Sequence, residues 1–183
     1  MRHRIVKNAA LTAVAAVALL LWASPTLAGQ KMTWKEVSRL SQVHKMQAPD
    51  AEDHLLGIYE HKGVALFPDG RAAAMLSMGR FDVYDREGGR RKHDGYAKIS
   101  FADGSAIFFK CQGTETFKDG SKLPWVTGTG TFMKGIGRYK GIKGTLTYEG
   151  GYVTGLDKND QGGDAVLTYQ AEYTLEKQGA GKI

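Results

Sequence analysis

A glycine-rich stretch, residues 128–151, constrains the fold of this chain more than any other feature of its sequence. It reads GTGTFMKGIGRYKGIKGTLTYEGG and holds eight of the 24 glycines. In both arms of the stretch, threonines alternate with glycine or apolar residues, which is the period of two that strands require. Glycines between the arms permit the positive φ angles of a sharply curved connection. The stretch therefore predicts a hairpin, onto which the other strands of the chain can pair.

Residues 1–28 are predicted to be a cleaved signal peptide. Arg2, Arg4 and Lys7 form a positively charged start, an apolar run follows, and small residues precede a cleavage site after Ala28. The apolar run is shorter than the ~20 residues of a membrane span, so cleavage is favoured over an uncleaved anchor. We therefore expect an exported protein, periplasmic or extracellular, with no membrane anchor after cleavage.

The predicted mature chain of 155 residues has the size of one domain. Cleavage leaves 22 basic and 19 acidic side chains, a net charge of +3, so the composition gives no basis for nucleic-acid binding. The short basic run at residues 90–92 is interpreted as a solvated loop. Cys111 is the only cysteine, so no intrachain disulfide can form. Stability must therefore come from packing.

The segment 30–47 is the one helix that the sequence predicts. Apolar residues recur in it at near-helical spacing: Trp34, Val37, Leu40 and Val43. Thr33 and Glu36 stand three residues apart, as in a capping box, and Pro49 ends the pattern. We therefore expect a short N-terminal helical segment over residues 29–49, packed across one end of the fold.

From residue 50 onward the sequence reads as strands separated by turns. Strand patterns cover residues 55–61, 63–67, 71–85, 96–101, 105–115, 126–133, 145–148 and 165–175. About eight strands at such short spacing favour a closed antiparallel barrel or a sandwich over an α/β fold, and closure also removes exposed sheet edges. The predicted fold is all-β: an eight-stranded antiparallel closed β-barrel over residues 50–177, with one short N-terminal helix and a flexible tail at 178–183.

The chain resembles a family of bacterial secreted barrels in three stretches: DAEDHLLGIYEHKG, GYAKISFADGSAIFFKCQGT and the glycine-rich stretch. The family is the allene oxide cyclase and dirigent-like barrel superfamily, and the resemblance covers roughly residues 50 to 175. Its main signature is the pattern G.F..G.G.Y.GI.G from Gly130 to Gly144. The resemblance implies an eight-stranded barrel with a central pocket, commonly as a trimer. The resemblance extends to plant enzymes that hold a hydrophobic substrate inside the barrel. These enzymes cyclise a fatty-acid epoxide or steer radical coupling.

The alternation of side chains along two predicted strands identifies candidate site residues. Phe109, Cys111 and Glu115 share one face, and Tyr59 and His61 share a face of another strand. If these faces point inward, all five are candidate ligand-binding residues near a barrel mouth. A carboxyl group buried there would have a raised pKa suited to acid–base chemistry, so Glu115 is the candidate catalytic residue. The alternative is that Glu115 lies in water at a strand end and that Cys111 is an inert core residue.

No cofactor or metal site is predicted. The histidines after residue 28 lack the spacing of metal ligands, and Cys111 is far from each of them in the sequence. Residues 135–140 begin like a dinucleotide-binding fingerprint, but Lys140 stands where the third glycine belongs.

Three functions remain open from the sequence. The preferred one is an exported barrel that binds a small hydrophobic ligand non-covalently in its interior, because the strand pattern predicts a closed barrel and the mature chain holds 15 Phe and Tyr residues. The second is an isomerase or cyclase of the allene oxide cyclase type. The third is a non-catalytic structural module whose core is filled by side chains. For any of them the resemblance implies a homo-oligomer, and no nucleic-acid partner is expected.

Overall fold

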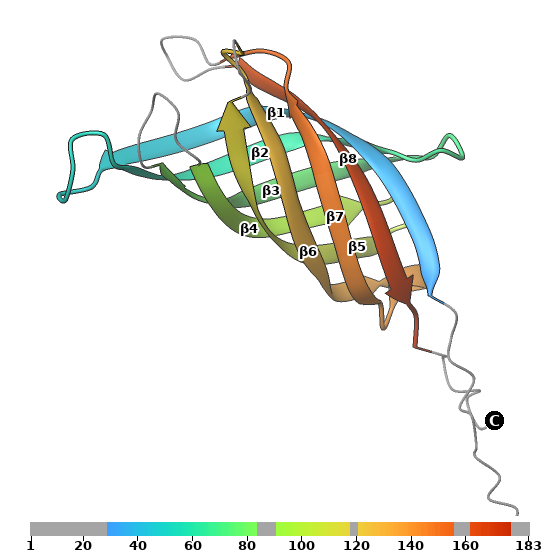
Figure 1. Ribbon diagram of the computed structural model, residues 1–183. Coiled ribbons are helices and arrows are strands. Elements are labelled where there is room, and N and C mark those ends of the chain that lie inside the picture. The colour runs from blue at the N-terminus through green and yellow to red at the C-terminus, as the bar shows by residue number, and fades with distance from the viewer. Residues whose placement is uncertain (1–28, 84–90, 118–120, 156–161, 177–183) are drawn as a thin grey trace, which may run out of the picture.

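Eight antiparallel strands close into one barrel in sequence order, each paired with the next and β8 paired with β1 (Figure 1). The computed structural model describes residues 29–83, 91–117, 121–155 and 162–176. The strands are β1 Gln30–Gln47, β2 Leu55–Leu66, β3 Ala72–Val83, β4 Arg91–Ser100, β5 Ala106–Phe117, β6 Pro124–Ile136, β7 Lys143–Tyr152 and β8 Gly162–Thr174. The predicted eight-stranded antiparallel closed barrel is confirmed. The predicted signal peptide at 1–28 and the tail at 178–183 lie outside the described residues.

The predicted N-terminal helix is wrong, because Gln30–Gln47 forms strand β1. This strand pairs with β8 along its first part and with β2 along its second, and it has a bulge after Leu40. Every second side chain is buried in the barrel: Met32, Trp34, Glu36, Ser38 and Leu40. Val37, which the helical pattern placed with Trp34, is 43% exposed on the outer face. Two of the five buried residues are polar, and this concealed the period of two in the sequence.

Two other differences concern strand bounds. The patterns at 55–61 and 63–67 form one strand, β2, so the total of eight is reached by adding β1. The strand predicted at 96–101 begins earlier than expected, because β4 starts at Arg91, within the basic run that was interpreted as a solvated loop. In β8, which matches the strand predicted at 165–175, Leu167, Tyr169 and Ala171 are buried on the inward face.

The glycine-rich stretch forms the predicted hairpin. Strands β6 and β7 pair antiparallel and are joined through a short 3-10 helix, η1 Gly137–Tyr139. Gly137 has a φ of 62°, in the left-handed region that favours glycine. Gly128 serves a different purpose, because a Cβ atom there would lie 2.2 Å from the ring of Tyr148. This glycine leaves room for a tyrosine side chain in the barrel interior.

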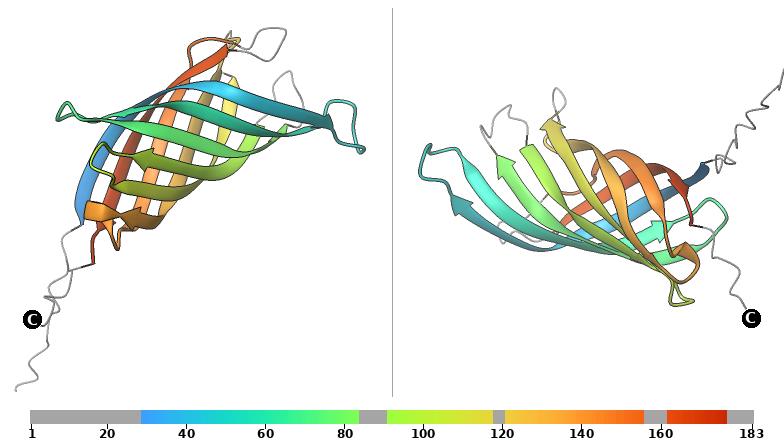
Figure 2. Two further views of the ribbon diagram at one scale, coloured as in Figure 1. Left: turned by 180° about the vertical axis from the view of Figure 1, so that it is seen from behind. Right: turned by 90° about the horizontal axis from the view of Figure 1, so that it is seen from below.

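The apolar core fills one end of the barrel, which we call the closed end. Its most deeply buried large side chains are Trp34, Ile99, Ile107 and Phe109. Phe67, Phe101 and Tyr139 pack at its base, and the Arg138 guanidinium lies 4.6 Å from the centre of the Phe101 ring. The start of β1 and the end of β8 also lie at this end (Figure 2). We call the opposite end the mouth.

Candidate ligand-binding cavity at the barrel mouth

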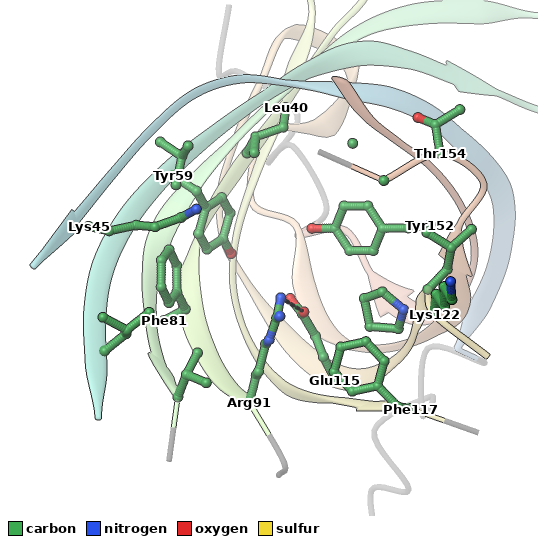
Figure 3. A pocket seen from close by; sticks show the side chains of 17 residues that line it. Leu40, Lys45, Tyr59, Phe81, Arg91, Glu115, Phe117, Lys122, Tyr152 and Thr154 are labelled. Atoms are coloured by element: carbon green, nitrogen blue, oxygen red, sulfur yellow. Dashed lines mark ion pairs between the residues drawn. The ribbon is translucent and has the colours of Figure 1, made fainter. Parts of the chain in front are cut away.

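A cavity of about 400 Å³ opens at the mouth of the barrel (Figure 3). Its apolar lining comprises Leu40, Val43, Leu55, Phe81, Val83, Phe117, Leu123 and Pro124. Its polar lining includes Tyr59, Glu115, Tyr152 and Thr154 and three cationic residues, Lys45, Arg91 and Lys122. The volume lies within the range of ~300–1,000 Å³ that is usual for small-molecule sites, and the mixture of apolar wall and few polar groups is also typical of them.

Glu115 and Arg91 form an ion pair in the wall of this cavity. The two residues are partners in the β4–β5 register, and Arg91 Nη1 lies 3.5 Å from Glu115 Oε2. Figure 3 shows the two side chains directed toward one another. Burial raises the pKa of Glu115, and Arg91 offsets only part of that effect. The carboxyl group therefore keeps its proton to a higher pH than a solvated glutamate.

Two tyrosine hydroxyl groups extend toward the centre of the cavity. Tyr59 comes from β2 and Tyr152 from the end of β7 (Figure 3). The Tyr152 hydroxyl group also lies 3.3 Å from Nε2 of His61. Burial raises the pKa of both tyrosines above the usual value, so both remain neutral hydrogen-bonding groups at physiological pH.

A layer of polar side chains separates the mouth cavity from the closed-end core. It surrounds a second, inner cavity of about 50 Å³. Within the layer, the Tyr169 hydroxyl group donates a 2.6 Å hydrogen bond to Glu36, and Ser38 Oγ lies 3.4 Å from Nδ1 of His61. Burial raises the pKa of Glu36. The interior that the described residues form is therefore solid and apolar at one end, polar in the middle and open at the mouth.

Two buried histidines belong to the same layer. His93 Nε2 lies 2.7 Å from the Tyr148 hydroxyl oxygen, whereas Nδ1 has no hydrogen-bond partner among the described residues and lies 4.0 Å from Glu115 Oε1. Burial lowers the pKa of both His61 and His93 to about 4. Both imidazoles are therefore neutral at physiological pH, and each can accept or donate a hydrogen bond.

The structure brings together four of the five residues that the sequence nominated. Tyr59 and Glu115 line both cavities, and His61 and Cys111 line the inner one. Glu115 is 9% exposed, so it does not lie in water at the strand end. Burial raises the pKa of Cys111 to about 11, which keeps its thiol protonated. Phe109 is 1% exposed and packs against Trp34 in the core, where it lines neither cavity.

Several residues of the site were missed by sequence reasoning. Glu36 and Ser38 fell in the segment predicted to be helical, and Arg91 and His93 precede the strand predicted at 96–101. A signal for β4 was present, because His93, Gly95, Ala97 and Ile99 alternate with polar or exposed residues. A period-two reading that accepts inward polar residues would have recovered both strands.

No cluster of three or more His, Cys, Asp or Glu side chains that can hold a metal ion occurs among the described residues. Within those same residues no helix is long and apolar enough to cross a membrane. The polar groups that line the mouth cavity are a carboxyl group, hydroxyl groups and cationic side chains. These groups can bind and orient an organic molecule through hydrogen bonds and charge.

The fold and the cavity together define an all-β closed barrel with an open, partly apolar interior, and solved structures of similar shape are known. A pterocarpan synthase dirigent protein matches with a TM-score of 0.45 and 10% identity over 81% of this chain and 91% of the other. A conserved protein of unknown function from Rhodopseudomonas palustris matches with a TM-score of 0.48 and 8% identity over 80% and 98%. A nonspecific heme-binding cyclase, which catalyses a cycloaddition during neoabyssomicin biosynthesis, matches with a TM-score of 0.42 and 14% identity over 84% and 71%.

The first of these structures is a dirigent protein, the kind of barrel that the sequence resembles. No protein-family model and no curated protein matches the sequence. At such identities and TM-scores the three structural matches carry no argument about activity. The functional argument therefore rests on the cavity itself.

Proposed function

We propose that this protein binds a small, largely hydrophobic molecule non-covalently in the mouth cavity. The supporting observation is the cavity of about 400 Å³, with aliphatic and aromatic walls and with Tyr59, Glu115 and Tyr152 among its polar groups. The apolar walls supply affinity by removing hydrocarbon from water, and the polar groups orient the ligand. A purely structural module with a filled core is less favoured, because side chains fill the closed end and leave the mouth open.

A cavity-filling variant tests this proposal. Val43 is half-buried in β1, lies opposite Tyr59 in the strand register and lines the cavity. We expect Val43→Trp to weaken the binding of the neutral fluorescent probe N-phenyl-1-naphthylamine by at least ~10-fold, because the indole would occupy the volume of the probe. Fluorescence titration measures the dissociation constant.

The matched control is Val37→Trp, which places the same indole on the outer face of the same strand. Val37 is exposed, so we expect the affinity for the probe to stay as in the wild type. Equal losses in both variants, or no probe binding by the wild type, would argue against a ligand site at the mouth.

An isomerase or cyclase is the second candidate function, and the observation that favours it is the buried carboxyl group of Glu115 at the cavity wall. A carboxyl group that is protonated at higher pH than usual can act as a general acid or base on a bound molecule. We expect a ligand recovered from the native host to be converted to an isomer by the wild type and not by Glu115→Gln. Chromatography with mass spectrometry distinguishes the two isomers, and conversion by both proteins would remove Glu115 from any catalytic role.

Export and assembly complete the proposal. A protein whose residues 1–28 are removed would act in the periplasm or outside the cell, and a homotrimer is the assembly that the sequence resemblance implies. Both statements remain predictions from the sequence.

A further inference from the structure

Among the described residues, the lining of the mouth cavity carries more positive than negative side chains. Lys45, Arg91 and Lys122 line it, and Glu115 is the one acidic residue that the described part of the chain contributes. That one carboxyl group is already paired with Arg91. A ligand with a negatively charged group would therefore meet a complementary field at the mouth.

Arg91 is placed to exchange one anionic partner for another. Its side chain is 36% exposed, whereas the carboxyl group of Glu115 is buried behind it in the cavity wall. The guanidinium also lies 5.2 Å from the centre of the Phe117 ring, which holds it over an apolar surface. A guanidinium has several N–H donors, so an anion arriving from the solvent side can bond to Arg91.

Because of the groups around Glu115, its protonation state determines how tightly such an anion binds. The ionisable residues that face it are Arg91 and His93 from β4, Tyr59 from β2 and Tyr152 from β7, with Lys45 and Lys122 elsewhere in the mouth wall. The inner cavity, which Glu115 also lines, adds Glu36, His61, Cys111, Tyr148 and Tyr169. The tyrosines and His93 are neutral near pH 7 because of burial. Among the described residues that line the mouth cavity, Glu115 is thus the one group that brings negative charge when it ionises.

We propose that the ligand of the mouth cavity is an amphipathic organic anion and that its binding is coupled to the uptake of one proton by Glu115. This inference rests on the proposed function. When Glu115 is ionised, its carboxylate holds Arg91 and repels the incoming anion. When Glu115 is protonated, that repulsion disappears and Arg91 pairs with the ligand. Affinity for the anion therefore rises as the pH falls through the pKa of Glu115.

Two fluorescent probes that share an apolar body test the coupling. N-phenyl-1-naphthylamine is neutral, and 8-anilinonaphthalene-1-sulfonate adds a sulfonate that stays ionised across the experiment. Dissociation constants are measured from about pH 5 to about pH 8, where circular dichroism confirms the folded barrel. We expect the affinity for the neutral probe to be nearly constant. We expect the affinity for the sulfonate probe to fall with rising pH, by up to ~10-fold per unit above the pKa of Glu115.

Variants assign the effect to the ion pair. Glu115→Gln should bind the sulfonate probe tightly at every pH. Arg91→Gln should bind it ~10-fold more weakly at the lowest pH, where Glu115 is protonated, because the cation that pairs with the sulfonate is gone. Glu176→Gln and Lys143→Gln are the controls, because they break an exposed ion pair at the closed end with the same changes in charge. Both controls should keep the wild-type profile.

The possible failures are distinguishable. Absence of binding for both probes would overturn the proposed function itself. Binding of the neutral probe alone, or the same pH profile in the wild type and Glu115→Gln, would overturn the coupled-anion proposal and leave a neutral ligand site at the mouth.

Discussion

Replacing Trp34 with alanine is expected to lower the free energy of unfolding by about 3–5 kcal/mol. Trp34 is 1% exposed and stacks on Tyr169 at 4.7 Å, with further ring contacts to Phe67 and Phe109. Its indole nitrogen has no hydrogen-bond partner among the described residues, so the loss comes from apolar contacts and the cavity left behind. Urea unfolding followed by circular dichroism measures the change. Domains are commonly stable by only ~5–15 kcal/mol, so this substitution would remove a large part of the free energy of unfolding.

Val37→Ala is the control for this substitution. It also distinguishes a strand from a helix at residues 30–47. A helix with the predicted apolar face would bury Val37 beside Trp34, so both variants would be costly. In strand β1, Val37 is on the outer face, and its replacement should change the stability by no more than ~0.5 kcal/mol. If the two substitutions cost the same, Trp34 cannot occupy the core position described above.

The second large effect is a loss of stability in acid that depends on His61 and His93. The pKa of each is about 4 in the folded protein, against 6.5 for an unperturbed histidine, because burial disfavours the charged imidazole. As the pH falls below 6.5, the unfolded chain binds protons that the folded barrel does not, and the folded state loses stability until the pH reaches about 4. Each histidine accounts for a loss of about 3 kcal/mol over this window.

The double variant His61→Gln and His93→Gln isolates this effect. Glutamine does not titrate, so the slope of unfolding free energy against pH between 6.5 and 4 should become smaller than in the wild type. Glu36 and Glu115 act in the opposite direction, because their raised pKa values favour the folded state as the pH falls, but they are present in both proteins. His44→Gln, on the exposed outer face of β1, controls for the substitution itself. An unchanged slope in the double variant would contradict the buried, neutral state of the two imidazoles.

The candidate site was predictable in strands where apolar side chains occupy every second position and so mark the inward face. Glu115 shares a face with Phe109 and Cys111, so placing that face inward was enough to bring Glu115 to the cavity wall. The same reasoning failed for Glu36, because a buried glutamate looks like a solvent-facing residue in a sequence. Its burial depends on a hydrogen bond from Tyr169, which is 133 residues away in the chain. No local pattern contains that partner.

The sequence by itself determined an all-β fold class, the glycine-rich hairpin, seven of the eight strands and the residues that share a face in β5, because turn residues and side-chain alternation are local properties. Only the tertiary structure decided that residues 30–47 form a strand. It also decided which polar groups surround the inner cavity and where the mouth cavity lies, beside the Arg91–Glu115 pair. A strand receives its backbone hydrogen bonds from neighbours that are distant in sequence, and here β1 bonds to both β2 and β8. Such long-range pairing overrides the local helical spacing, and a cavity exists only where strands from the whole chain leave space between their side chains.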